Sequence, residues 1–409
     1  MKIFLQILFN FFILAQITLP QWFQQNTGIY TLMDVSFANT NIGLAVGGNG
    51  IILKTLDGGV NWSEQTSGTI NDLYSVCLTN TNVGFVVGQL GTILETIDGG
   101  ENWIQQASGT TLILVDVSFI DESNGIVVGD SIILRTTNGG TIWTQQSSVG
   151  IYSLSAISFI DANNAISVGF DLSTYSGLVL RTTNGGLSWT QQLSGVSEWL
   201  EDVSFSDVNN GIIVGWQGII LKTTNGGLNW IQQTSGTTYS LYGVAFINSI
   251  YASASGLFGT ILRTTNGGMD WEQQTSGTTR LLYSLFFIDE NIGWAVGDDE
   301  TILHTTNGGV TYIEEGGLAD VPKDFILNQN YPNPFNPSTV IKYSVPNISW
   351  VTIIVFDVIG NEIETLVDAE KTTGTYELTW NAKNLSSGIY FYTIKAGAYV
   401  ATKKMVLLK

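Results

Sequence analysis

The chain has 409 residues, of which 12% are charged and 11% aromatic, and its 46 glycines favour strands and tight turns over long helices. Its net charge of −19 is unevenly placed, because residues 22–317 hold 26 acidic and 6 basic residues whereas residues 318–409 hold 8 of each. So acidic a surface repels phosphate backbones and anionic lipids, which argues against nucleic acids and membrane surfaces as partners.

Residues 1–20 are typical of a signal peptide. Lys2 provides a positive charge, residues 3–14 form a nearly continuous apolar stretch, and Ala15 is a small residue near the expected cleavage point, although the A-x-A pattern is not met. The stretch is short for a membrane span, and the sequence has no other long apolar segment. We therefore predict an exported protein with no transmembrane segment.

An internal repeat occupies residues 21–316. Seven units end in a Gly-Gly pair followed three residues later by an aromatic residue, with spacings of 41, 40, 46, 41, 41 and 41. Each unit carries four strand signals, which in the third unit are Leu114–Ile120, Gly125–Gly129, Ile132–Thr136 and Trp143–Gln146. The pattern predicts an all-β fold, a seven-bladed β-propeller of four-stranded antiparallel blades. The repeating aromatic residues are Trp62, Trp103, Trp143, Trp189, Trp230, Trp271 and Tyr312.

The strand that carries the repeating aromatic residue occurs eight times, whereas the other three strands occur seven times. Trp22 lies 40 residues before Trp62 and begins the extra copy. One terminal copy, at Trp22 or at Tyr312, is therefore expected to complete the blade at the opposite end of the repeat. Closing the ring in this way removes the first and last exposed sheet edges.

The turn between the third and fourth strands of every unit contains Asp-Gly or Asn-Gly, the strongest short hairpin signal. The phrase Thr55-x-Asp57-x-Gly59-x-x-Trp62 resembles the Asp-box of bacterial sialidases and related propellers, in which it is a structural turn. The whole repeat, with Leu-x-x-Val-x-Phe, Gly-x-x-Val-Gly and Gly-x-Ile-Leu-x-Thr-x-x-Gly-Gly-x-x-Trp, resembles the propeller family of photosystem II stability/assembly factors. This resemblance implies the fold, but the arginine-rich face of some members is absent, so no photosystem role is expected.

Composition changes after the repeat. Residues 317–324 form a polar linker, and residues 325–409 open with a Tyr-Pro-Asn-Pro-Phe-Asn-Pro phrase that begins at Tyr331. This phrase and the terminal Lys-Lys-Met at residues 403–405 resemble the type A C-terminal sorting domain of the type IX secretion system. The resemblance implies a small immunoglobulin-like β-sandwich that engages the type IX secretion machinery and is then cleaved. The protein would be secreted or attached to the outer-membrane surface.

Few residues are available for catalysis. Cys77 and His304 are the only cysteine and histidine, which excludes an intramolecular disulfide and a Cys/His zinc site. Cys77 occupies a repeat slot held mostly by serine, and His304 shares a slot with arginines and lysines that we expect to form cross-strand pairs. We predict no enzyme, no cofactor and no metal site, although the many acidic residues leave a two-carboxylate glycoside hydrolase as an alternative.

The first strand of each unit is expected to line the central channel. Three aspartates at that radius either hold a hard cation through oxygen ligands or hydrogen-bond to backbone and solvent at the channel rim, and we favour the second alternative. They belong to the set of residues two positions after the leading leucine: Asp34, Ser75, Asp116, Ala156, Asp202, Gly243 and Ser284.

The binding face is expected opposite the near-identical Asx-Gly-Gly turns, because the loops of that face vary. The fourth unit is longer than its neighbours, within residues 170–177, and aromatic residues follow in consecutive units beside Glu201 and Asp202. We predict that they cluster in one sector suited to stacking on sugar rings. The candidate ligand-binding residues are Phe170, Tyr175, Glu198, Trp199, Trp216, Tyr239 and Phe258.

Two function classes remain. The propeller is either a non-catalytic binding module for a polysaccharide or protein ligand, or a structural surface element without a discrete ligand. We favour the binding module because exposed aromatic patches often mark interaction sites. A glycan array would separate the two classes.

Export generates the first testable prediction. We expect the mature protein to begin near residues 16–22 and to lack residues 325–409, because both segments resemble processing signals. Mass spectrometry of surface and medium fractions should find this shortened chain. An intact chain found only in the cytoplasm would contradict the prediction.

Overall fold

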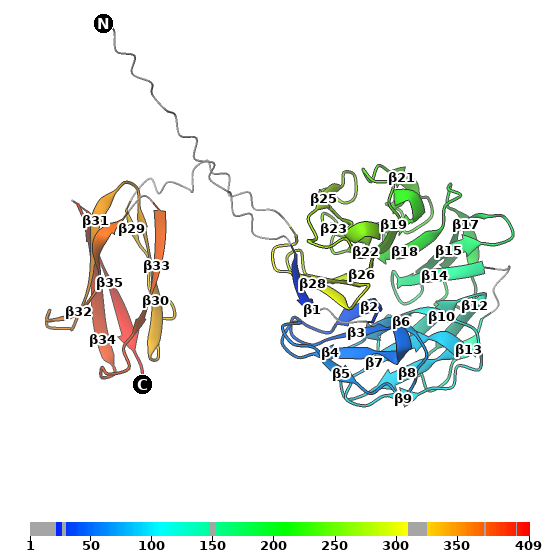
Figure 1. Cartoon of the computed structure of the whole chain (residues 1–409), viewed down its shortest axis with the longest axis horizontal. Helices are drawn as coiled ribbons and strands as arrows, with labels where there is room; N and C mark the ends of the chain where they lie inside the picture. Colours follow the sequence, from blue (N-terminus) through cyan, green and yellow to red (C-terminus); the bar gives the residue numbers. More distant parts are fainter. Residues whose placement is uncertain are drawn as a thin grey trace, which may run out of the picture. The chain divides into compact units, whose positions relative to one another are not determined.

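The computed structural model describes residues 22–26, 30–146, 150, 152–309, 325–371, 374–397 and 399–409. They form two compact units, one within residues 19–311 and one that includes residues 312–409, both built almost wholly of strands (Figure 1). The helices of this described part are three-residue 3₁₀ turns, namely η1 (Gly48–Gly50), η2 (Gln89–Gly91), η3 (Trp216–Gly218) and η4 (Leu257–Gly259). None of these turns is long or apolar enough to cross a membrane.

The first unit consists of seven four-stranded antiparallel sheets, which confirms the predicted propeller. The first strands of neighbouring blades contact one another all the way round the ring. Blades one to three contain β2 (Leu32–Phe37), β3 (Gly43–Gly47), β4 (Ile52–Thr55), β5 (Ser63–Gln65), β6 (Leu73–Leu78), β7 (Gly84–Gly88), β8 (Ile93–Thr96), β9 (Ile104–Gln105), β10 (Leu114–Phe119), β11 (Gly125–Gly129), β12 (Ile132–Thr136) and β13 (Thr144–Gln145). Blades four to six contain β14 (Tyr152–Phe159), β15 (Ala165–Asp171), β16 (Ser176–Thr182), β17 (Thr190–Leu193), β18 (Leu200–Phe205), β19 (Gly211–Gly215), β20 (Ile220–Thr223), β21 (Ile231–Gln233), β22 (Leu241–Phe246), β23 (Ala252–Gly256), β24 (Ile261–Thr264) and β25 (Glu272–Gln274).

The seventh blade joins the two ends of the repeat. It contains β26 (Leu282–Phe287), β27 (Gly293–Gly297) and β28 (Thr301–Thr305), and its fourth strand is β1 (Phe23–Asn26). Phe23 lies opposite His304 in this antiparallel pair. The N-terminal copy therefore closes the ring, which settles the choice between Trp22 and Tyr312, and Tyr312 itself lies outside the described residues.

The hydrophobic cores of the propeller lie between blades rather than within them. One cluster joins Phe85 and Ile93 of blade two to Leu114 and Val127 of blade three, and Trp143 packs against it with 8% of its surface exposed. The Trp143 ring lies edge-on to Phe85, with a centroid distance of 6.5 Å. The repeating tryptophan of one blade thus fills the space next to the preceding blade.

Each Asx-Gly-Gly turn is held by a threonine and an Asx side chain. In blade one, the Thr55 hydroxyl donates to Asp57 Oδ1 at 2.9 Å and accepts from Gly59 N at 2.8 Å, and Asn61 N donates to Asp57 Oδ1. The left-handed φ angles fall on the two glycines, 71° at Gly58 and 88° at Gly59. Glycine is therefore required at both positions, while the Asx residue serves as a hydrogen-bond acceptor.

The basic residues of the third strands do not form the cross-strand pairs that we expected. Arg135 Nε donates instead to the Gly185 carbonyl in the turn of the next blade, at 2.6 Å, and Arg181 Nε donates to the Gly226 carbonyl in the same way. Lys54 forms an ion pair with an acidic residue of the next turn, at 2.6 Å. These three side chains therefore tie blades one, three and four to the blade that follows at the turn face.

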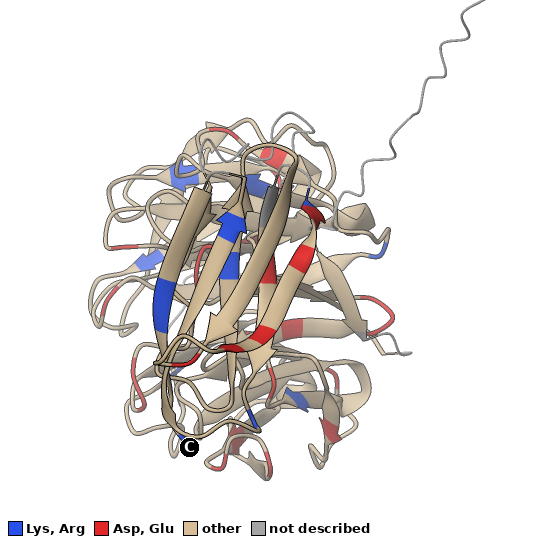
Figure 2. Cartoon of the chain, turned by 90° about the vertical axis from the view of Figure 1, so that its left-hand side faces the viewer, with Lys and Arg blue, Asp and Glu red and all other residues tan. Residues whose placement is uncertain are grey.

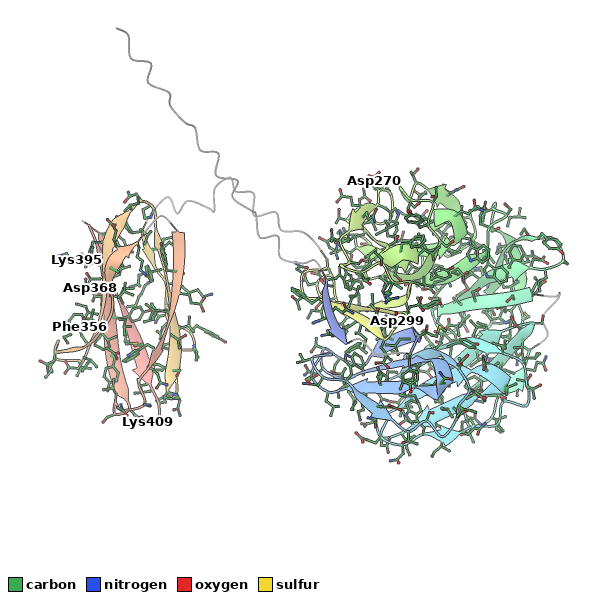
Figure 3. All side chains as sticks on the ribbon, viewed as in Figure 1. Asp270, Asp299, Phe356, Asp368, Lys395 and Lys409 are labelled. Atoms are coloured by element: carbon green, nitrogen blue, oxygen red, sulfur yellow. The ribbon has the colours of Figure 1, made fainter. Side chains whose placement is uncertain are left out.

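The second unit is a two-sheet β-sandwich, as predicted. A three-stranded sheet (β29-β30-β33) faces a four-stranded sheet (β32-β31-β34-β35) around one core that contains Trp380, Tyr343 and Tyr392. Lysines and acidic residues share its strands (Figure 2). Asp368, one of the residues labelled in Figure 3, accepts a hydrogen bond from Trp350 Nε1. The strands are β29 (Ile326–Leu327), β30 (Ser338–Val345), β31 (Ser349–Phe356), β32 (Glu362–Lys371), β33 (Gly374–Asn381), β34 (Gly388–Ala396) and β35 (Tyr399–Leu407).

The packing of Trp143 generates a stability prediction. Trp143→Ala should lower the free energy of unfolding by about 3–5 kcal/mol, because it leaves a cavity between blades two and three. Ile70→Ala is the control, since Ile70 is 86% exposed and its loss should cost no more than about 0.5 kcal/mol. Urea denaturation followed by fluorescence measures both. Equal stability of the two variants would show that the tryptophan does not support the ring.

Candidate functional site

A pocket of about 450 Å³ lies where the first strands of all seven blades converge. In every blade the register between the first and second strands shifts just after the leading leucine, so one residue has no partner in the ladder. Such a β-bulge redirects the side chain of its extra residue. The seven bulge residues all line this axial pocket, and they are Met33, Tyr74, Val115, Ser155, Glu201, Tyr242 and Tyr283.

The aspartates that follow the bulges hold neighbouring blades together. Asp34 accepts hydrogen bonds from its own neighbour Val35 N and from Val76 N of the next blade, both at 2.8 Å. Asp116 and Asp202 repeat this arrangement towards blades four and six, with 2.7 Å to the amide of the next blade in each case. Both carboxylate oxygens are thus engaged by backbone donors, which is the second of the two expected roles. Among the described residues, no group of three or more histidine, cysteine or acidic side chains is placed to hold a metal ion.

Small residues alternate with these aspartates around the axis and complete the ring. Ser75 Oγ donates to Asp116 at 2.7 Å, and Ser284 Oγ donates to Asp34 at 2.7 Å. Gly243 leaves room for the next blade, because a Cβ atom there would lie 3.0 Å from Ser284 Cα. The alternation therefore gives each aspartate a neighbour small enough to approach it closely.

Burial raises the pKa of all three aspartates. The pKa of Asp34 rises from 3.8 to about 6, chiefly because the carboxylate is buried, although the hydrogen bonds from Ser284 and Val76 oppose the rise. The pKa of Asp116 is also raised by burial, and that of Asp202 lies well above its usual value. The charges of Asp34 and Asp116 add to the rise at Asp202. At the centre of the propeller these three carboxyl groups therefore hold their protons to a higher pH than free aspartate does.

Four of the predicted aromatic residues form one continuous stack beside the pocket. Phe170 lies parallel to Trp199 with a centroid distance of 4.8 Å, and Trp199 stacks on Trp216 at 5.7 Å. Tyr175 meets Phe170 edge-on at 6.4 Å. Trp199 and Trp216 line the axial pocket, so the predicted sector reaches the axis of the propeller.

The remaining predicted residues do not join this stack. Tyr239 and Phe258 form a separate edge-to-face pair at 5.1 Å, and among the described residues no ring contact links this pair to the stack. Glu198 accepts a hydrogen bond from the neighbouring Ser197 N and does not line the pocket. The predicted single cluster is therefore divided into two groups, and its acidic component is Glu201 rather than Glu198.

Glu201 is the only charged residue among the seven bulge positions. Its carboxylate accepts a hydrogen bond from Trp216 Nε1, while Trp199 Nε1 donates to Ser155 Oγ at 2.9 Å. Burial raises the pKa of Glu201 from 4.5 to about 7, against the opposing effect of the Trp216 hydrogen bond. Both indole rings are thus held in place by polar partners in the pocket wall.

Three tyrosines of the pocket were not predicted as site residues. Tyr242 and Tyr283 meet edge-to-face at 5.8 Å, and the Tyr74 hydroxyl accepts a hydrogen bond from Gln89 Nε2 at 3.0 Å. Burial raises the pKa of Tyr283 to about 12. A signal for these residues exists in the sequence, since the bulge position is the variable position directly after the leucine found in every first strand.

Cys77 and His304 both pack within the propeller. Cys77 is half-buried in the core between blades two and three, and burial raises the pKa of its thiol to about 12, which makes it unreactive. His304 stacks on Trp294 with a centroid distance of 5.0 Å, and burial lowers its pKa. Neither side chain lines the axial pocket.

Comparison with known families places both units. The family profile of photosynthesis system II assembly factor YCF48 matches residues 15–112, 102–195 and 188–275, which together cover more than half of the chain. The chain belongs to this family. The profile of the secretion system C-terminal sorting domain matches residues 329–408. This YCF48-type propeller therefore carries a type IX sorting domain, which directs export to the cell surface or beyond.

Solved structures show the same fold. YCF48 from Cyanidioschyzon merolae aligns with a TM-score of 0.59 and 22% identity, covering 69% of this chain and 98% of that one. A structure of YCF48 bound to D1 peptide aligns with 0.59 and 19%, covering 70% and 94%. PorZ, a surface component of the type IX secretion system of Porphyromonas gingivalis, aligns with 0.55 and 12%, covering 94% and 60%. The comparison with curated proteins found no match.

The aspartate ring of this YCF48-type propeller generates a pH prediction. Folding raises the pKa of Asp34 from 3.8 to about 6, so the folded protein retains a proton that the unfolded chain releases. The stability that Asp34 contributes is therefore complete below pH 3.8 and is lost as pH rises through 6. The free-energy difference between wild type and Asp34→Ala should shrink by up to about 3 kcal/mol over this range.

Urea denaturation at several pH values measures this difference. Asp57→Ala is the control, because hydrogen bonds from Asn61 lower the pKa of Asp57 and its titration lies below the same pH window. A difference for Asp34→Ala that stays constant or grows between pH 4 and pH 6 would contradict the account of the ring.

Proposed function

We propose that the propeller is an exported, non-catalytic binding module whose ligand, a polysaccharide or a protein, occupies the axial pocket. The observation that carries this proposal is the combination in one pocket of two stacked indole rings, Trp199 and Trp216, with the half-buried carboxyl group of Glu201. Pockets of a few hundred cubic ångströms with apolar walls and a few placed polar groups are typical of ligand sites.

Three further features support a ligand at this end of the axis. Trp216 is 44% exposed although it is held by Glu201, so its ring is presented to solvent in a defined position. Tyr175, at the end of the stack, is 74% exposed, so this end of the stack is also presented to solvent. A related propeller has been solved with a bound peptide.

The pocket gives less support to a glycoside hydrolase. That chemistry needs one carboxyl group as acid and a second as nucleophile or base. Asp34, Asp116 and Asp202 each use their oxygens to hold backbone amides of two blades. Glu201 alone among the pocket carboxyl groups has a side-chain donor in place of backbone donors, so we favour binding over hydrolysis.

Arrays of glycans and peptides test the proposal with the purified chain. The double variant Trp199→Ala/Trp216→Ala should weaken binding of any array ligand by at least about tenfold, because buried aromatic residues dominate binding energies. The matched control is Tyr239→Ala/Phe258→Ala, which removes the separate aromatic pair outside the pocket.

Two outcomes would contradict the proposal. No ligand on either array would favour a structural surface element. A ligand whose affinity falls equally in both double variants, or only in the control, would place the binding site elsewhere on the propeller.

A further inference from the structure

We propose that the axial pocket accepts the cationic side chain of a partner protein, a lysine ammonium or an arginine guanidinium. This inference rests on the proposed function and names the chemistry of its ligand. Three observations carry it: the acidic residues of the pocket, the aromatic rings of its wall, and the backbone amides that already occupy the carboxylates of Asp34, Asp116 and Asp202.

The pocket contains four carboxyl groups and no basic residue. Asp34, Asp116, Asp202 and Glu201 line it, and its other lining residues are aromatic, aliphatic or hydroxylated. The three ion pairs of the described chain, Lys54–Glu101, Arg280–Asp299 and Lys342–Glu377, all lie outside it. The carboxyl groups of the pocket therefore have no basic residue of the protein among their neighbours in the pocket wall, and those that are ionised attract a cation towards the axis.

The walls suit an organic cation. Trp199, Trp216, Tyr74, Tyr242 and Tyr283 bring five aromatic rings to one pocket, and the faces of such rings attract ammonium and guanidinium groups. Lysine and arginine also carry apolar stems that pack on aromatic and aliphatic surface while the charged head meets a carboxylate. An amine attached directly to a sugar ring lacks such a stem.

The three aspartates of the pocket are poorly placed to bind a metal ion. Each of the three aspartates already accepts amides from two blades, and a hard cation would need those oxygens as ligands. Glu201 is different, because its carboxylate accepts the indole N–H of Trp216, and it lines the same pocket as the five rings. Glu201 is thus the residue that would meet the charged head.

Titration of the full chain with small probes tests the inference by NMR. The probes are Nα-acetyl-lysine methylamide, Nα-acetyl-arginine methylamide, the uncharged norleucine analogue and glucosamine. We expect a cationic amino-acid probe to bind at least about tenfold more tightly than norleucine, as a charged hydrogen bond in a buried site requires. Glu201→Gln should remove this preference, whereas Glu272→Gln should keep it.

The two variants are matched. Each replaces one carboxyl group by an amide of the same shape, but Glu272 is exposed on the outer strand β25 of blade six. Trp216 Nε1 retains an acceptor in Glu201→Gln, so the pocket geometry is expected to survive. Unchanged melting temperatures would show that both variants are folded.

The pH dependence gives a second readout. Affinity for the lysine probe should rise between pH 6 and pH 8, because the pKa of Glu201 is about 7 and the ionised form binds the cation. In Glu201→Gln the affinity for the lysine probe should not show the part of this increase that comes from ionisation of Glu201. The other titratable groups that line the pocket are unchanged in both variants, and they are Asp34, Asp116, Asp202, Tyr74, Tyr242 and Tyr283.

The outcomes separate this inference from the proposed function. Equal affinity for norleucine, preference for glucosamine, or an equal loss in Glu201→Gln and Glu272→Gln would each overturn the cationic side chain as ligand. A further outcome is an uncharged or anionic array ligand whose binding is abolished only in Trp199→Ala/Trp216→Ala. That result would overturn the cationic side chain as ligand but would support the binding function proposed for the pocket.

Discussion

The propeller depends on hydrogen bonds that join the first strand of one blade to the first strand of the next. A sheet of four strands has two edges, and the inner edge of every blade lies against its neighbours around a crowded axis. Three aspartates join neighbouring inner strands, because each carboxylate accepts one backbone amide of its own strand and one of the following blade. They are Asp34, Asp116 and Asp202. Backbone donors that a ring geometry leaves unpaired are thereby satisfied.

The same logic recurs farther from the axis. Between the blades, Trp143 and its equivalents fill the wedge-shaped space with aromatic surface, and at the turns Arg135 reaches the carbonyl of Gly185 in the next blade. Each of these contacts joins one unit to the following unit. A repeat whose core lies between neighbours cannot fold as a single copy, which is why the chain must close on itself through β1 and β28.

Local signals explain why the fold was predictable from the sequence. The Thr-x-Asx-Gly-Gly turn stabilises itself within five residues, so the spacing of Gly58-Gly59 and its six equivalents reveals the blades directly. The direction of ring closure was not predictable, because Trp22 and Tyr312 carry the same phrase and only the pairing of β1 distinguishes them. The contacts of Arg135 and Arg181 with the turn of the next blade were not predicted. The pattern of strands in a sequence indicates which residues are neighbours within one sheet, but not which residues of different blades meet.

The candidate site was predictable only in part, for a reason that concerns the backbone. Regular alternation along a strand gives each residue a fixed face, but the bulge after each leading leucine interrupts it and turns Glu201, Tyr242 and Tyr283 towards the axis. The aromatic loops were found because they are exposed and variable. Glu198, Glu201 and Asp202 were all expected beside the aromatic residues. The bulge brings Glu201 into the pocket, whereas Glu198 lies outside it.

The bulge also explains how a uniform ring can carry a specific site. A residue inside the ladder must match its cross-strand partner, and the residue after the bulge must be small or acidic to satisfy the next blade. Neither constraint applies to the bulge residue, since it lacks a cross-strand partner and its side chain lines the pocket. Methionine, tyrosine, valine, serine and glutamate all occur at this position in the seven blades. Binding chemistry can change at seven positions around one axis while the contacts between blades remain the same.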